Sequence, residues 1–118
     1  MSEEKKKIAD DIMKQMEKVL NENKDLNEGW GGSDQVIFTD IETGYWIKFA
    51  MDGSIEKIVK KPVSEIKLED AEATVSCTVD VIKDVIDGKS NAMEAMGENK
   101  FKIEGSMAAL MKLGPAIM

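Results

Sequence analysis

The chain has 118 residues, of which 42% are hydrophobic and 33% are charged, and its formal net charge is −7. A chain of this length can bury a substantial core, and we expect one domain over residues 1–118. All sixteen basic residues are lysines. An acidic chain without arginine argues against nucleic acid as a partner. Phosphate backbones bind cationic surfaces, and arginine is the residue that usually contacts phosphate and guanine groups.

The sequence contains no histidine and a single cysteine, Cys77. Without histidine, the commonest general base and the commonest transition-metal ligand are missing, so we expect no enzyme activity, no metal and no cofactor. The acidic pairs Asp10-Asp11 and Glu69-Asp70 occur in charged surroundings. We expect them to be solvent-exposed charge, because a carboxylate site needs converging side chains and burial.

No stretch approaches the roughly 20 apolar residues that span a bilayer. The first seven residues lack the apolar core of a signal peptide. A lone cysteine cannot form an internal disulfide, which is typical of a reducing compartment. These observations predict a cytoplasmic protein.

Residues 3–23 carry apolar side chains at steps of three and four, at Ile8, Ile12, Met16, Val19 and Leu20. This spacing predicts an amphipathic helix packed on a sheet. The glycine-rich residues 27–34 predict a loop. Trp30 in this loop either caps the core or lies at a cavity mouth, and we favour the cap.

Three strands are predicted next, at residues 36–41, 45–51 and 54–59. Asp52-Gly53 is a strong signal for a tight hairpin between the second and third strands. Pro62 ends this antiparallel meander, because proline cannot donate to the ladder. Alternation in the second strand predicts one face made of Tyr45, Ile47, Phe49 and Met51 and another with Trp46 and Lys48.

The polar residues 64–70 predict an exposed segment that crosses to the next strand. Alternation over residues 73–77 predicts a strand with Ala73, Val75 and Cys77 facing inward. No cation or histidine is placed to activate the Cys77 thiol, so we expect a small core residue there.

Two helices are predicted after this strand. Thr78 is placed to cap a helix over Val79 to Asp87, and Gly88 is placed to end it. Asn91 and Glu94 have the spacing of a capping box for a second, shorter helix.

Residues 100–104 alternate polar and apolar side chains, which predicts a half-buried strand with Phe101 and Ile103 facing inward. Gly105 permits a sharp change of direction. Ser106 is a favourable N-cap for the apolar helix that begins at Met107.

This final helix has almost no polar stripe, so it needs cover on more than one side. A core helix, the lid of a lipid cavity and half of a dimer interface all fit its residues. Pro115 disfavours helix at the residue before it, so the helix is expected to break near Leu113. Residues 116–118 would then form a mobile flap.

The order of elements predicts an α+β protein with one five-stranded sheet that carries its helices on one face. In the second half, Gly88-Lys89 ends a helix, a short helix follows, and the strand at 100–104 leads through Gly105-Ser106-Met107 into an apolar helix. This ordered set, over roughly residues 73–113, resembles the sterol carrier protein type two family. The resemblance implies a mainly antiparallel sheet, with an apolar tunnel for lipids between sheet and helices.

Five of the nine methionines lie at or after position 93. Methionine fills gaps in ordinary cores, but its flexible thioether also suits a surface that adapts to different apolar partners. Together with the resemblance, the cavity interpretation is favoured. The candidate lipid-binding residues are Ile82, Val85, Met93, Met96, Phe101, Ile103, Met107, Leu110 and Met111.

We therefore expect non-catalytic binding or transfer of a fatty acyl chain or another apolar lipid, sterol-like molecules included, with the last helix as a lid. Lys102 or Lys112 is expected to meet an acyl carboxylate at the rim. The alternative is a structural or dimerisation module of the same fold without a working cavity. The expected partners are the apolar ligand and, transiently, a membrane, with the chain a monomer or a homodimer.

Overall fold

A five-stranded sheet with the order β3-β2-β1-β4-β5 forms the base of the computed structural model, which describes residues 2–117. Neighbouring strands are antiparallel except β1 and β4, which are parallel. The predicted α+β fold with a five-stranded, mainly antiparallel sheet is confirmed. The strands are β1 (Ser33–Phe38), β2 (Thr43–Phe49), β3 (Ile55–Pro62), β4 (Ala73–Cys77) and β5 (Lys102–Gly105).

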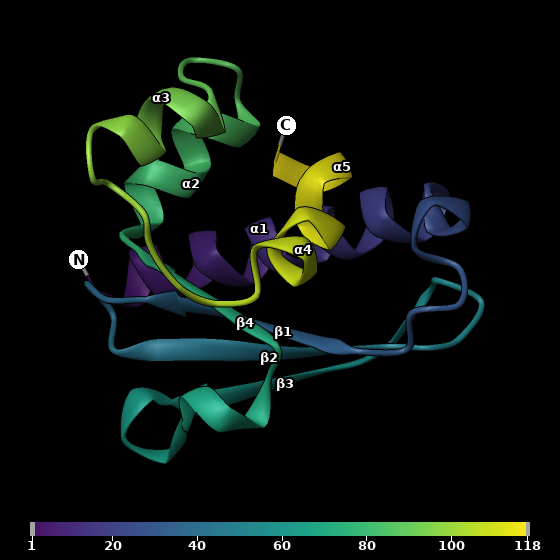
Figure 1. Ribbon diagram of the computed structural model, residues 1–118. Coiled ribbons are helices and arrows are strands. Elements are labelled where there is room, and N and C mark those ends of the chain that lie inside the picture. The colour runs from purple at the N-terminus through teal and green to yellow at the C-terminus, as the bar shows by residue number, and fades with distance from the viewer. Residues whose placement is uncertain (1, 118) are drawn as a thin grey trace.

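The five α-helices lie together on one side of the sheet, as Figure 1 shows. They are α1 (Ser2–Glu22), α2 (Val79–Ile86), α3 (Ala92–Gly97), α4 (Met107–Leu110) and α5 (Gly114–Ile117). Two 3₁₀ turns, η2 (Val63–Glu65) and η3 (Leu68–Asp70), lie on the opposite side. Two more, η1 (Lys24–Asn27) and η4 (Met111–Leu113), extend α1 and join α4 to α5.

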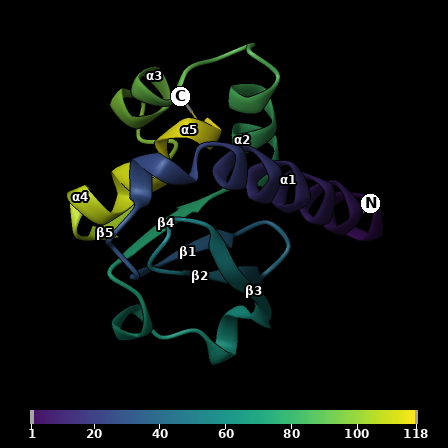
Figure 2. The ribbon, with the colours of Figure 1, turned by 90° about the vertical axis from the view of Figure 1, so that its right-hand side faces the viewer.

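The long helix α1 crosses the sheet and packs against α2, α5 and β3 (Figure 2). Its apolar residues recur every three or four positions, which places them on the inner face, as predicted. The side chains on this face that are buried are Ala9, Ile12, Met13, Met16 and Leu20.

The central strand β1 is covered on both faces, and all six of its residues are buried. Val36 and Phe38 belong to the core under the helices. Gln35 points to the other face, where its side-chain amide donates to the carbonyl oxygen of Lys67 at 3.1 Å. Residues 63–72 thus cover the far face of the sheet, which confirms the predicted crossing segment and gives it a packing role.

Trp46 lies on this far face, where its indole N–H donates to the carbonyl oxygen of Asp70 at 2.9 Å. The ammonium groups of Lys57 and Lys61, from the neighbouring strand β3, lie 5.5 Å and 6.0 Å from the indole ring centre. Cation–π contact of this kind holds both lysines against the ring.

Several predicted boundaries were wrong. Strand β1 begins at Ser33 rather than at 36, because Ser33 and Asp34 pair with Lys48 and Ile47 across β2. Met51 is 65% exposed instead of facing inward, because β2 ends at Phe49 before the turn.

The predicted flap at the C-terminus was also wrong for the described residues. The helix does break where expected, at η4, but the chain then enters α5. Pro115 stands in the first turn of α5, where its missing N–H leaves no hydrogen bond unmade. Ala116 and Ile117 are half-buried and pack on the core, while Met118 lies outside the described residues.

A short hydrogen bond from Tyr45 on β2 helps to hold α1 on the sheet. The Tyr45 hydroxyl donates to Oδ1 of Asp10 at 2.5 Å, and this bond, with help from Lys60, holds the pKa of Asp10 below its usual range. Replacing Tyr45 by phenylalanine is expected to lower the free energy of unfolding by about 1 kcal/mol at pH 7. The loss should shrink as the pH falls below the usual aspartate pKa of 3.8, because Asp10 is then protonated in the unfolded chain and increasingly in the folded one.

Urea unfolding at several pH values measures this loss. Lys102→Met is the control, because Lys102 forms an exposed ion pair with Glu104 that should contribute little. An equal loss in Tyr45→Phe at pH 7 and at acid pH would contradict the assignment.

Candidate functional site

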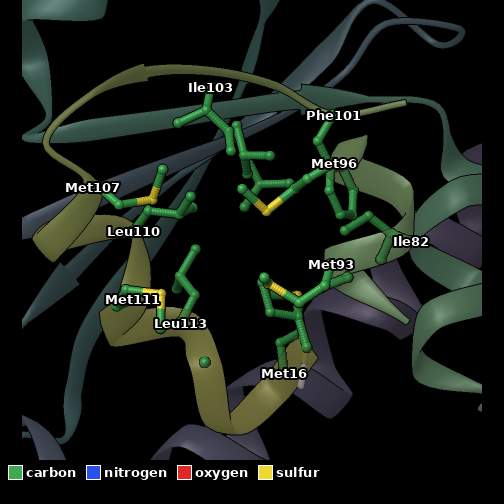
Figure 3. A pocket seen from close by; sticks show the side chains of 15 residues that line it. Met16, Ile82, Met93, Met96, Phe101, Ile103, Met107, Leu110, Met111 and Leu113 are labelled. Carbon is green, nitrogen blue, oxygen red and sulfur yellow. The ribbon is translucent and has the colours of Figure 1, made fainter. Parts of the chain in front are cut away.

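An apolar pocket of about 300 Å³ lies between the sheet and the helices. Figure 3 shows side chains from both layers converging on it. Every lining residue within 2–117 is apolar, so none of these side chains offers an occupant a charge or a hydrogen-bonding group. The lining residues are Met16, Val36, Val75, Ile82, Ala92, Met93, Met96, Phe101, Ile103, Met107, Leu110, Met111, Leu113, Gly114 and Ile117.

The turn from β5 into α4 positions three of the lining residues. Gly105 has φ +95°, a conformation in which other residues are strained, and a Cβ there would also collide with the carbonyl oxygen of Glu72. The Ser106 hydroxyl then accepts from the backbone N–H of Ala109 at 3.2 Å and starts α4 as an N-cap. This turn places Met107, Leu110 and Met111 over the end of the pocket opposite α3.

The short helix α3 supplies the facing wall. The Asn91 side chain accepts from the backbone N–H of Glu94 at 2.7 Å, which fixes the start of the helix. Met93 and Met96 reach the pocket from this helix. Met93 is 67% exposed, and Met107 and Met111 across from it are 50% and 51% exposed. These three side chains, here called the methionine rim, mark the mouth (Figure 3).

The family model described as the SCP-2 sterol transfer family matches residues 13–118. The chain belongs to this family. The resemblance drawn from the second half of the sequence is thereby confirmed, and the match extends it upstream through the meander and the C-terminal part of α1, from residue 13.

Solved structures agree with the family assignment. The chain is similar to a crystal structure of sterol carrier protein 2, with a TM-score of 0.63 and 15% identity over 89% of this chain and 86% of that one. It is equally similar to sterol carrier protein-2 like-3 from Aedes aegypti, with a TM-score of 0.63 and 14% identity over 89% of this chain and 92% of that one. At such identities, the likeness shows the fold alone.

A larger protein carries the same fold. The inverting sec-alkylsulfatase from Pseudomonas sp. matches with a TM-score of 0.60 and 15% identity, covering 80% of this chain. The chain spans only 14% of the length of that sulfatase. A comparison with curated protein sequences finds no match.

In this member of the family, eight of the nine candidate lipid-binding residues lie around this pocket. Val85 does not line it, although it is buried in the core one helical turn beyond Ile82. Whether the eight bind lipid stays a prediction. They are Ile82, Met93, Met96, Phe101, Ile103, Met107, Leu110 and Met111.

Seven lining residues were not singled out from the sequence. Met16 and Val75 were predicted to be buried, but periodicity does not tell a buried side chain that meets other atoms from one that borders a cavity. The remaining five lie on β1, at the start of α3 and along the C-terminal segment: Val36, Ala92, Leu113, Gly114 and Ile117.

Neither candidate rim lysine lines the pocket. Lys102 is paired with Glu104 at 3.4 Å, and the Lys112 ammonium lies 5.8 Å from the ring centre of Trp30. Trp30 in turn packs on Phe49, with 5.2 Å between ring centres, and caps the core as predicted.

Residues 2–117 contain no cluster of three acidic or cysteine side chains that could hold a metal ion. Burial raises the pKa of the Cys77 thiol to about 12, so this group is protonated and unreactive at neutral pH. No helix in the described range is long and apolar enough to cross a bilayer.

The pocket has a polar neighbour in Asp34, which is fully buried. Asp34 lies two residues before the lining residue Val36, so its side chain is on the same, helix-covered face of β1. Neither carboxyl oxygen has a hydrogen-bond partner among the described residues. Burial, together with the negative charge of Glu72, raises the Asp34 pKa to about 8, although Lys112 opposes this. A buried carboxyl without a partner keeps its proton near neutral pH.

Replacing Asp34 by asparagine tests this assignment. The folded protein holds the Asp34 proton up to about pH 8, whereas the unfolded chain releases it near the usual pKa of 3.8. The contribution of the bound Asp34 proton to the free energy of unfolding is therefore fully present below about pH 4, and it is lost as the pH rises to 8. The variant cannot titrate there, so its free energy of unfolding relative to the parent should rise by up to about 1.4 kcal/mol per pH unit in this window.

Chemical unfolding of both proteins between pH 4.5 and pH 8 measures this difference, in which all other titrating groups cancel. Leu68→Asn, at an exposed side chain on η3, is the control and should show a flat difference, because it changes no titrating group. A flat difference for Asp34→Asn as well would contradict the raised pKa.

Proposed function

We propose that this protein binds and carries an apolar lipid or fatty acyl chain in the pocket between the sheet and the helices. The observation that carries the proposal is a cavity of about 300 Å³ whose lining among the described residues is apolar, with three exposed methionines at its mouth. Cavities of this size and lining are the usual form of small-molecule sites. Membership of the SCP-2 sterol transfer family supports the same function.

The driving force for binding is the burial of hydrocarbon. Each methylene moved from water into an apolar site contributes about 0.8 kcal/mol, before the costs of association. No polar contact is needed for useful affinity. The flexible thioethers of the rim can adapt to chains of different shape, which suits a carrier more than a site selective for one head group.

We place the carrier in the cytoplasm, where the single buried thiol of Cys77 fits a reducing compartment. Lipid exchange would bring the methionine rim against the membrane that donates or receives the ligand. Catalysis is not part of the proposal. The sulfatase that shares this fold is a much longer enzyme, of which this chain spans 14%.

A second candidate is a structural module in which the methionine rim packs on another protein or on a second copy of the chain. The exposed apolar side chains of Met93, Met107 and Met111 favour it, because such patches often mark interfaces. Size-exclusion chromatography with light scattering separates the two. A monomer that takes up lipid supports the carrier, and an obligate dimer that takes up none supports the module.

Two exposed methionines provide a matched test of the carrier. Met107 is 50% exposed and lines the pocket, whereas Met51 is 65% exposed and does not. Met107→Glu should weaken fatty-acid binding at least about tenfold, because it brings a charge to the mouth of a site without polar partners. Met51→Glu should bind as the parent does, and both variants should fold, since neither side chain is buried.

Displacement of a fluorescent fatty acid from the purified proteins measures these affinities, and native mass spectrometry checks the stoichiometry. If the parent protein binds no fatty acid in either assay, the carrier proposal is wrong. Equal losses in Met107→Glu and Met51→Glu would mean that binding occurs elsewhere.

A further inference from the structure

We infer that the methionine rim is a site of reversible oxidation. Oxygen transfer from a peroxide to the thioethers of Met93, Met107 and Met111 converts them to sulfoxides and weakens the binding of the apolar ligand, and reduction restores it. The inference rests on the proposed function and adds a control by redox conditions to the mouth of the same pocket.

The methionine side chains differ widely in their access to solvent. Those of the rim are 67%, 50% and 51% exposed, and Met51, in the turn after β2, is 65% exposed. Met13 and Met16, on the inner face of α1, are 3% and 1% exposed. A peroxide dissolved in water reaches exposed thioethers first. Of the four methionines within residues 2–117 that are at least half exposed, three therefore stand at the pocket mouth.

The single thiol of the chain is protected from the same oxidant. Cys77 is 4% exposed, and burial raises the pKa of its thiol to about 12. Because the thiolate is the form that reacts with peroxides, this group does not consume the oxidant at neutral pH. In the described part of the chain, the exposed thioethers are the sulfur atoms that remain for a peroxide to oxidise.

The chemical step is the transfer of one oxygen atom. The lone pair of the thioether sulfur attacks one oxygen of the peroxide, so that an S–O bond forms and the O–O bond breaks. The sulfur loses two electrons, and the second oxygen leaves as water, or as an alcohol from an organic peroxide. Two thiols reverse the step, because they return the two electrons, join as a disulfide and release the oxygen as water. Sulfoxide reductases catalyse this return, one for each configuration at sulfur.

A sulfoxide changes what the mouth offers to hydrocarbon. Met107 and Met111 stand on one side of the mouth and Met93 across from them, so an occupant meets thioethers on both sides (Figure 3). The S=O group is polar and accepts hydrogen bonds, whereas the lining side chains within residues 2–117 donate none. A sulfoxide pressed against bound hydrocarbon loses water without gaining a partner. This cost arises only in the complex, and it corresponds to about a factor of ten in affinity.

Peroxide treatment of the full chain, with and without a bound fluorescent fatty acid, shows which methionines react. Peptide mass spectrometry follows the oxidation of each methionine with time. We expect the rim methionines and Met51 to oxidise at least about tenfold faster than the buried Met13 and Met16. Bound fatty acid should slow oxidation at the rim and leave Met51 unaffected, because Met51 does not line the pocket.

The affinity for the fluorescent fatty acid is measured before and after treatment. The oxidised parent should bind about tenfold more weakly, and both sulfoxide reductases with a thiol should restore its affinity. The triple variant Met93→Leu, Met107→Leu, Met111→Leu keeps an apolar rim that a peroxide cannot oxidise. Its affinity should therefore change little from its own starting value. Met51→Leu is the matched control, and its affinity should fall as far as that of the parent.

The outcomes separate this inference from the proposed function. Rim methionines that oxidise no faster than Met13 and Met16, as a dimer closed through the rim would give, overturn the inference. An oxidised parent that binds as before, or that loses affinity only by unfolding as seen by circular dichroism, overturns it and leaves lipid binding intact. So does a triple variant that loses as much affinity as the parent. If the untreated parent binds no fatty acid, the proposed function is wrong and its redox control with it, while the oxidation rates still identify the reactive thioethers.

Discussion

The parallel pairing of β1 with β4 is the constraint on which the rest of this structure depends. Parallel neighbours cannot be joined by a tight turn, so the chain has to travel between them. It does so by building β2 and β3 outward from β1 and then returning across the far face through residues 63–72. Helix α1 precedes this sheet and packs on β3, whereas α2 to α5 follow β4, with α4 packing on β4 and β1. The helical layer therefore combines one helix that precedes the strands in the sequence with four that follow β4.

The pocket between the sheet and the helices results from this arrangement. The helices that follow β4 in the sequence are short, and α4 spans only four residues. They cover the sheet but do not fill the space between it and the helical layer. Phe101, Ile103 and the methionines around them point into this space from its edges. Ordinary cores are packed as densely as organic crystals. In the function proposed above, hydrocarbon fills this apolar space and restores the dispersion contacts that its walls lack.

Local signals in the sequence were sufficient for most elements. Spacing of three and four predicted α1, alternation predicted β4, and the caps at Thr78, Asn91 and Ser106 all accept the hydrogen bonds that their positions suggested. Non-local pairing was not predictable in the same way. Ser33 and Asp34 join β1 because β2 extends far enough to pair with them. Asp34 in particular, a charged residue type in a predicted loop, gave no sign of its burial.

The candidate site shows the same difference between what local sequence signals predict and what depends on non-local packing. Eight lining residues were predicted because the family resemblance implied a cavity between sheet and helices. The positions of the methionines then indicated which segments form its walls. Val85 was predicted with Ile82 because both are inward positions on α2. Which of two inward side chains borders an empty space depends on what the other elements leave unfilled. That information is spread over the whole chain and is not carried by any one segment of it.

The lysines beside Trp46 have a consequence for how molecules of this protein meet one another. Strand β3 is the outermost strand on its side, and an edge strand of this kind is a template for adding a strand from another molecule. Among residues 2–117, an edge donor is taken only at its start, where the backbone N–H of Ile55 donates to Oδ1 of Asn21. Lys57 and Lys61, held against the indole, and Pro62 at the end of the strand stand along this edge. A second strand would have to approach through like charges and meet a residue that cannot donate. The edge is thereby protected against intermolecular sheet growth.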